Sequence, residues 1–328
     1  MRNLTLQKTN IIACVLHSLS FIAVLVLYLV YKKSRPLGNV NFYRNQLSGQ
    51  ISSIVPPVYP DTLPYCSTGG NVNPGQCTVS PNFQQPKKVS MMNVVVSCMI
   101  FFAITAIFHA LYAWDGFIPG LSKHSKGFYT TVIDDGWNPY RWIEYGLTAS
   151  LMSVILGSVQ GTGDILTILF MAGVTGAMQF GGGYTSESVM RKSIVENIGF
   201  VQKQVLLGSS LSAWLLFIFL WFANFYCFTT TAIEIKKKFK DIIDPETNEP
   251  IKVQGFVYFL VIFKFLSYLS FGLIQFYQIY KNWNVINYTK LINFENIEIL
   301  YLMLSFISKF GLAGGVSFGL LLQTKDCN

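Results

Sequence analysis

The chain has 328 residues, of which 52% are hydrophobic and only 12% are charged. Soluble globular domains carry about 25% charged residues, so this composition excludes an ordinary soluble domain. Lys and Arg outnumber Asp and Glu by 24 to 16, but the charges gather at the ends of apolar runs. That distribution is typical of membrane boundaries rather than of a nucleic-acid groove. We therefore predict an integral, multi-pass membrane protein in contact with membrane lipid, with no nucleic-acid partner.

Apolar runs of about 20 residues predict membrane-spanning helices, because that length crosses a hydrocarbon core of about 30 Å. The chain contains seven such runs, at 11–31, 91–114, 142–160, 165–184, 205–233, 256–280 and 297–322. The fourth run is the richest in glycine. We predict an all-α membrane protein, a single seven-helix transmembrane domain over residues 1–328. An odd number of spans places the two ends of the chain on opposite sides of the membrane.

Residues 32–90 predict one long loop between the first two helices, because eight of the 12 prolines of the chain fall there. The loop also contains Cys66 and Cys77. These cysteines are expected to form a disulfide if the loop faces an oxidising space, and the alternative is two free thiols. The lysines and arginines outside the spans are almost evenly divided between the two sides, so charge alone does not fix the orientation.

Ionisable side chains are costly in lipid, so each one within a span is a candidate functional residue. The candidates that we take from the predicted spans are His17, His109, Glu144, Lys264 and Lys309. Glu144 is the only acid expected to lie deep in the membrane. A buried lysine loses its proton or pairs with an acid, so two lysines compete for one carboxylate. The sequence has no nucleotide-binding glycine motif, His-x-x-x-His pair or Cys-x-x-Cys pair, which argues against an enzyme.

Lys309 is the better functional candidate of the two lysines. Glycines follow it, and Ser305 precedes it by one helical turn. Helical side chains lean toward the N-terminal end of their helix, so the Lys309 amine is expected beside the Ser305 hydroxyl. Lys264 has bulky apolar neighbours, and we interpret it as a packing residue or as a lysine whose amine reaches back to the membrane surface.

Depth along the helix axes suggests which polar residues meet. With a rise of about 1.5 Å per residue, the Lys309 amine and Glu144 lie within about 12 Å of the surface on the N-terminal side, so they can be neighbours. His17 and His109 fall at the level of Glu144. The alternative for the two histidines is that each is a core residue whose hydrogen bonds are satisfied locally.

Two local strings resemble the heliorhodopsins, a family of retinal-binding proteins with seven helices. The third span carries Asn-Pro-Tyr-Arg-Trp-Ile-Glu-Tyr at 138–145 and Thr-Ala-Ser-Leu-Met at 148–152. The seventh carries Tyr-Leu-Met-Leu-Ser-Phe-Ile-Ser-Lys at 301–309. Trp214 matches a tryptophan of the family's pocket wall. The chain departs from the family at Ala213, where a proline is usual, and at Gly314, where a tryptophan is common.

This resemblance implies a specific cofactor and site. All-trans retinal would form a protonated Schiff base on Lys309, with Glu144 as its counterion. The implied cofactor-binding residues around them are Ser305, Tyr145, Met152, Trp214, His17 and His109. The resemblance also implies a homodimer, a cytoplasmic N-terminus, an extracellular C-terminus and an extracellular loop at 32–90, where Cys66 and Cys77 would meet oxidising conditions.

The leading hypothesis is a light-sensing photoreceptor, in which photoisomerisation moves the Schiff-base proton and changes the shape of the protein. Light-driven or light-gated proton transport is the alternative, because some viral members of the family are reported to carry protons. A proton relay across about 30 Å needs several titratable groups, which weighs against it. A seven-helix ligand receptor without retinal would leave Lys309 unexplained.

Overall fold

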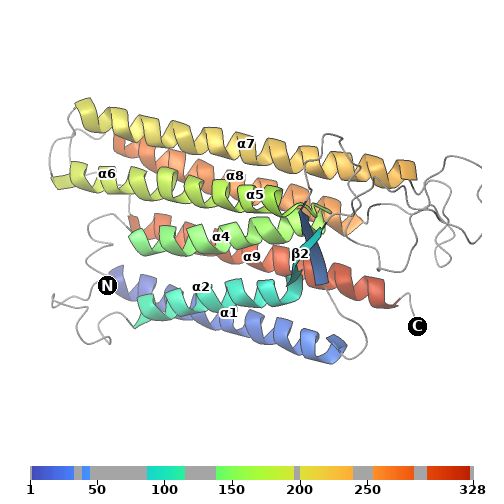
Figure 1. Cartoon of the computed structure of the whole chain (residues 1–328). Coiled ribbons are helices and arrows are strands. Elements are labelled where there is room, and N and C mark those ends of the chain that lie inside the picture. Colours follow the sequence, from blue (N-terminus) through green and yellow to red (C-terminus); the bar gives the residue numbers. More distant parts are fainter. Residues whose placement is uncertain are drawn as a thin grey trace, which may run out of the picture.

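The computed structural model describes residues 2–32, 39–44, 87–114, 138–195, 200–238, 253, 255–283 and 294–325 (Figure 1). Within these residues, seven helical segments are long and apolar enough to cross a membrane, which confirms the predicted seven-helix bundle. They are α1 (Arg2–Lys32), α2 (Val94–Ala113), α4 (Pro139–Val159), the continuous run of α5 (Ile165–Ala177), η1 (Met178–Tyr184) and α6 (Thr185–Val195), α7 (Phe200–Lys238), α8 (Gly255–Trp283) and α9 (Phe294–Lys325).

The helices run alongside one another, and the two ends of the chain lie at opposite ends of the bundle (Figure 1). Helix α4 packs against α2, α5, α8 and α9, while α1 packs against α2 and α9. Because α4 has helices on several sides, most of its side chains are shielded from the surroundings. Side chains on the facing surfaces of α2, α4 and α9 therefore meet inside the bundle.

The outer surface of the bundle is apolar. Large hydrophobic side chains such as Leu19, Ile107 and Phe222 are more than half exposed. Lipid solvates such side chains, so an apolar outer surface is the expected one for a membrane-spanning bundle. The core is formed by aromatic and aliphatic side chains from several helices, among them Phe101 of α2 and Ile155 of α4.

The fourth span is longer than the sequence pattern predicts. Its apolar helical segment covers Ile165–Met190, 26 residues, whereas the prediction ended at 184. The polar sequence Thr185-Ser-Glu-Ser interrupts the apolar run, but the helix continues because Ser186 and Glu187 find buried partners. The hydroxyl groups of Ser186 and Ser209 of α7 lie 2.9 Å apart.

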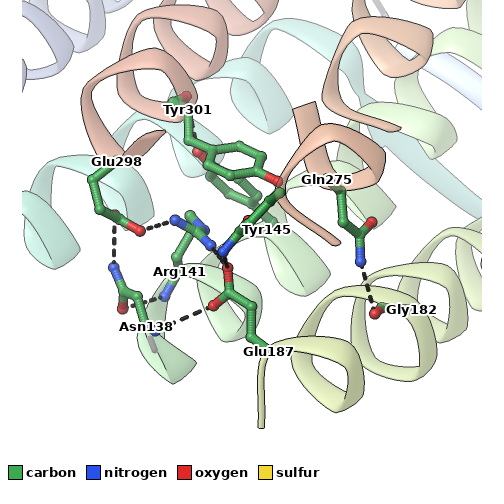
Figure 2. Close-up of polar contacts among 9 residues, drawn as sticks. Asn138, Arg141, Tyr145, Gly182, Glu187, Gln275, Glu298 and Tyr301 are labelled. Atoms are coloured by element: carbon green, nitrogen blue, oxygen red, sulfur yellow. Dashed lines mark hydrogen bonds and ion pairs between the residues drawn. The ribbon is translucent and has the colours of Figure 1, made fainter. Parts of the chain in front are cut away.

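Two glycines of the π-helical segment η1 allow neighbouring helices to approach closely. A Cβ atom on Gly183 would lie 2.1 Å from the Trp142 ring of α4, and one on Gly182 would lie 2.2 Å from the Ala213 Cβ of α7. A π-helical turn also disturbs the regular backbone hydrogen bonds. The Gly182 carbonyl accepts a hydrogen bond of 2.7 Å from Gln275 Nε2 of α8 (Figure 2).

Two strands lie within the segment that the sequence predicts as loop. Strand β1 (Asn39–Arg44) pairs with β2 (Lys87–Asn93) in an antiparallel two-stranded sheet. Strand β2 also includes the first residues of the predicted second span, and Asn93 then caps α2, its side chain accepting a hydrogen bond of 3.0 Å from the Val96 amide. Cys66 and Cys77 lie outside the described residues, so their disulfide stays a prediction.

Candidate functional site

Lys309 of α9 and Glu144 of α4 form an ion pair inside the bundle. Lys309 Nζ lies 2.5 Å from Glu144 Oε1, and both side chains are almost completely buried. The amine also donates to Ser305 Oγ at 2.7 Å, one turn earlier on the same helix. Thr105 Oγ1 of α2 donates to the same carboxylate oxygen at 2.8 Å. Buried charges are tolerated where an opposite charge and hydrogen bonds compensate their desolvation, and this pair has both.

Tyr145 lies on one side of the ion pair. Its ring centroid is 5.3 Å from Lys309 Nζ, which is within range of an attractive contact between a cation and an aromatic ring. Its hydroxyl donates to the Tyr301 carbonyl at 3.0 Å, and Phe271 packs against it edge to face with ring centroids 5.3 Å apart. These contacts hold the ring in one position beside the amine.

His17 of α1 and His109 of α2 stack with ring centroids 5.5 Å apart and an interplanar angle of 10°. Asn10 Oδ1 lies 3.0 Å from His109 Nδ1, and His109 lines a small cavity together with Glu144. His17 is fully buried, yet neither of its ring nitrogens has a hydrogen-bond partner among the described residues. The described residues therefore give no support to the interpretation of His17 as a core residue with locally satisfied hydrogen bonds.

An interior space begins at the Lys309 amine. It consists of two adjoining cavities, the first lined by Lys309, Ser305 and Met152, and the second by Trp214 and Phe217. Three residues line both: Gln179, Tyr268 and Phe271. Aromatic rings thus form part of the lining, with a buried amine at one end and Trp214 of α7 at the other. The space fits an apolar ligand attached to Lys309.

A second buried charge cluster lies where α4 begins, and Figure 2 shows its side chains. The Arg141 guanidinium of α4 pairs with Glu187 of α6 and with Glu298 of α9. Asn138 Nδ2 donates to Glu298 at 3.0 Å, and its backbone N–H donates to Glu187 at 3.2 Å. Gln278 of α8 donates to Glu187 at 3.1 Å. The cluster therefore joins α4, α6, α8 and α9.

Glu144 is not the only buried acid of the described helices. Glu187 is 0% exposed and Glu298 is 2% exposed. The sequence pattern missed Glu187 because it ended the fourth span at 184, and it did not count Glu298, the second residue of the seventh predicted span, among the candidates. Arg141 compensates both carboxylates, and its own guanidinium carbon lies 4.0 Å from the centroid of the Tyr301 ring. A small cavity lined by residues of both clusters connects Glu298 and Arg141 with Glu144.

Lys264 is fully buried, so its interpretation as a lysine that reaches the membrane surface is wrong. Its side chain lies between α8, α4 and α9, where Nζ is 2.8 Å from Ser308 Oγ and 3.8 Å from Met152 Sδ. The ring centroid of Tyr268, one turn further along α8, is 4.8 Å away. Among the described residues, no carboxylate contacts the Lys264 amine.

The two departures from the heliorhodopsin pattern lie in different places. Gly314 is exposed on α9, and a Cβ atom there would meet nothing within 4 Å, so this position faces away from the cavity. Ala213 lines the cavity and packs closely against Gly182. Only the departure at Ala213 therefore touches the space beside Trp214.

A seven-helix membrane bundle with a buried lysine and carboxylate at the end of an aromatic cavity has the architecture of a rhodopsin. A sequence model of the heliorhodopsin family matches residues 65–321, which is more than half of the chain. The chain belongs to the heliorhodopsin family. A search of curated proteins found no match. The protein is accordingly a retinal-binding, light-sensing rhodopsin that spans the membrane seven times, and its family is one of rhodopsins rather than of enzymes.

Proposed function

We propose that the protein is a photoreceptor in which Lys309 binds all-trans retinal as a protonated Schiff base and Glu144 is the counterion. The observation that carries this proposal is the buried pair of Lys309 and Glu144 at one end of the aromatic cavity. When bound, retinal supplies the absorption of visible light and a change of shape on isomerisation. The aromatic rings that line both cavities support a polyene as the ligand.

Glu144 stabilises a positive charge on the Lys309 nitrogen, and that charge in turn stabilises the carboxylate. Thr105 fixes the carboxylate by its hydrogen bond, and Ser305 accepts a hydrogen bond from the nitrogen. The two hydroxyl groups supply hydrogen bonds to the ion pair that water would otherwise have to supply. Because the nitrogen is bound on the side that faces Glu144, the two groups are positioned for proton exchange.

Three residues serve as walls for the chromophore. Tyr145 lies next to the Lys309 nitrogen, Met152 lines the same cavity, and Trp214 lines the adjoining one. Aromatic rings and a polarizable thioether suit a conjugated apolar ligand. These side chains are the ones that a change in ligand shape would push first.

We assign to the polar cluster of His17 and His109 the proton movement that follows light absorption. His109 shares a cavity with Glu144, and the unpartnered ring nitrogens of His17 can accept or donate a hydrogen bond after a rearrangement. Movement of a proton into this cluster would shift α1 and α2 relative to α9. By family resemblance, we assign a cytoplasmic N-terminus, an extracellular C-terminus and a homodimeric assembly.

Light-driven or light-gated proton transport is the second candidate function. Glu187 and Glu298 favour it, because they provide two further buried carboxylates, one of which shares a cavity with Glu144. In this function the Arg141 cluster would accept protons that leave the Lys309 nitrogen through Glu144. A light-induced pH change in a suspension of cells, measured with and without an uncoupler, distinguishes transport from signalling.

The experiment that tests the proposal is a visible absorption spectrum of the purified full-length chain after incubation with all-trans retinal. A band in the visible range is expected for a protonated Schiff base, whereas free retinal absorbs in the near ultraviolet. Treatment with sodium borohydride under light should bleach the band and fix the chromophore on Lys309, which peptide mass spectrometry can locate. Attachment at another lysine, or absence of the band in correctly folded protein, would refute the proposal.

A further inference from the structure

Lys264 takes no part in the pair of Lys309 and Glu144, although it is the other fully buried lysine of the described bundle. Its amine lies behind the cavity wall, since its three contacts, Ser308, Met152 and Tyr268, all line the cavity that contains Lys309. A second amine at this place is not required for the attachment of a ligand to Lys309. The attachment of a ligand therefore does not explain why a second amine is buried here.

The two amines lie at different depths in the bundle. Glu144 and Met152 are eight residues apart on α4, which corresponds to about 12 Å along the helix axis. Glu144 contacts the Lys309 amine, and Met152 contacts the Lys264 amine. Because α8 and α9 are consecutive spans of opposite direction, the two lysine side chains also lean in opposite directions. Lys264 therefore lies on the far side of Lys309 from the carboxylate.

The surroundings of Lys264 contain no negative charge among the described residues. Its polar contact is the Ser308 hydroxyl, and its other two contacts are a thioether and an aromatic ring. The titratable groups that face it are Tyr268 on its own helix, Cys98 of α2 and Lys309 of α9. A buried ammonium group without a carboxylate is strongly disfavoured, and the positive charge on Lys309 disfavours it further. These contacts therefore favour an uncharged amine at Lys264 while Lys309 carries a charge.

We propose that the two buried lysines share one positive charge, so that Lys264 is a proton-binding site coupled to the charge on Lys309. At rest the charge is on Lys309, where Glu144 compensates it. When the Lys309 nitrogen is uncharged or absent, the lone pair of the Lys264 nitrogen binds a proton supplied by water. The positive charge on Lys264 then replaces that on Lys309 as the buried charge that offsets the Glu144 carboxylate. Only the occurrence of this coupling in light rests on the proposed function. The sharing of one charge between the two lysines does not require retinal, so it can be tested in the retinal-free protein.

The test uses the retinal-free full chain in lipid vesicles, with lysine labelled by 15N at the side chain. Solid-state NMR separates an uncharged amine from an ammonium group by the chemical shift of this nitrogen. At pH 7, wild type should show one amine signal that is absent in Lys264→Met. In Lys309→Met, the Lys264 signal should move to the ammonium range. Lys236→Met, which removes an exposed lysine of α7, is the matched control and should remove only an ammonium signal.

Two results would overturn the proposal. An ammonium signal for Lys264 in wild type would mean that its charge is tolerated without coupling. An amine signal in both wild type and Lys309→Met would mean that Glu144 becomes protonated instead. If Lys264→Met does not fold, the wild-type spectrum still decides the first point, because the exposed lysines are charged at pH 7 and an amine signal can be identified by its shift alone. Retinal binding is not needed for either result, so failure of the photoreceptor assignment would be recognised separately.

Discussion

The Lys309 amine lies 2.5 Å from Glu144 Oε1 and 2.7 Å from Ser305 Oγ, so it is bound on the side that faces α4. The cavity is open to the same amine and extends toward Trp214. One nitrogen thus contacts both the only carboxylate of this part of the described bundle and the end of a space suited to a polyene. Substitution of either residue of the ion pair should therefore change the visible absorption more strongly than it changes the fold.

Lys309→Ala should abolish visible absorption after incubation with all-trans retinal, because no amine would remain at the end of the cavity. Lys264→Met should keep a visible band, because Met fills a similar volume and the Lys264 amine lies behind the cavity wall. Absorption spectra of both variants at equal protein concentration check this prediction. Colour that survives the first change, or that is lost only in the second, would assign the attachment to Lys264.

Glu144→Gln should shift absorption from the visible toward the near ultraviolet at neutral pH. The change removes the negative partner of the Lys309 nitrogen, so the Schiff base should lose its proton in a larger fraction of molecules. An anion from the buffer could take the place of the carboxylate, and the titration must therefore be made without chloride. Glu144→Asp is the matched control, because it keeps the charge.

An unchanged titration of Glu144→Gln in chloride-free buffer would identify another group as the counterion. The acids nearest in sequence to the ends of α2 and α4 are Asp115 and Asp135, which lie outside the described residues. The same spectra recorded for Asp115→Asn and Asp135→Asn would then locate the counterion.

Arg141→Gln should destabilise the protein by about 3–5 kcal/mol, because it leaves the buried carboxylates of Glu187 and Glu298 without their cation. Glu298→Gln should cost less, since the Arg141 pair with Glu187 remains. Thermal unfolding of the retinal-free protein, followed by tryptophan fluorescence, measures the difference. Equal unfolding temperatures for Arg141→Gln and wild type would show that the cluster contributes little to stability.

Sustained light-driven proton transport against a gradient is not expected. The buried acids of the described helices, Glu144, Glu187 and Glu298, all lie in the half of the bundle that contains the start of α4 and α9, whereas the half beyond Lys264 offers no buried carboxylate among those residues. A complete relay would need titratable groups in both halves. Illuminated cells should therefore show no lasting pH change that an uncoupler abolishes. Such a change would establish transport as the function, with Glu298 and His109 as the next residues to replace.

Hydropathy and helix geometry predicted much of the fold and part of the site. The seven spans follow from run length, and the approach of Lys309 to Ser305 follows from the four-residue spacing on one helix. The partners that close the site could not be predicted in this way, because they depend on packing between distant helices. Thr105 and Ser308 are ordinary polar residues in sequence, and only the arrangement of α2, α8 and α9 places them beside Glu144 and Lys264.

Gly183→Ala should destabilise the protein, because the added methyl group would lie 2.1 Å from the Trp142 ring. Overpacking of this kind costs about 1–3 kcal/mol when the neighbours can move aside. Trp142 cannot move freely, since it also packs edge to face against Tyr145 and Tyr301. The displacement should thus reach the Tyr145 ring beside Lys309 and shift the absorption maximum as well as the unfolding temperature. Gly181→Ala is the matched control in the same π-helical segment, because a Cβ atom there meets nothing within 4 Å. Equal unfolding temperatures and equal spectra for the two variants would show that α4 and η1 do not pack as closely as the structure indicates.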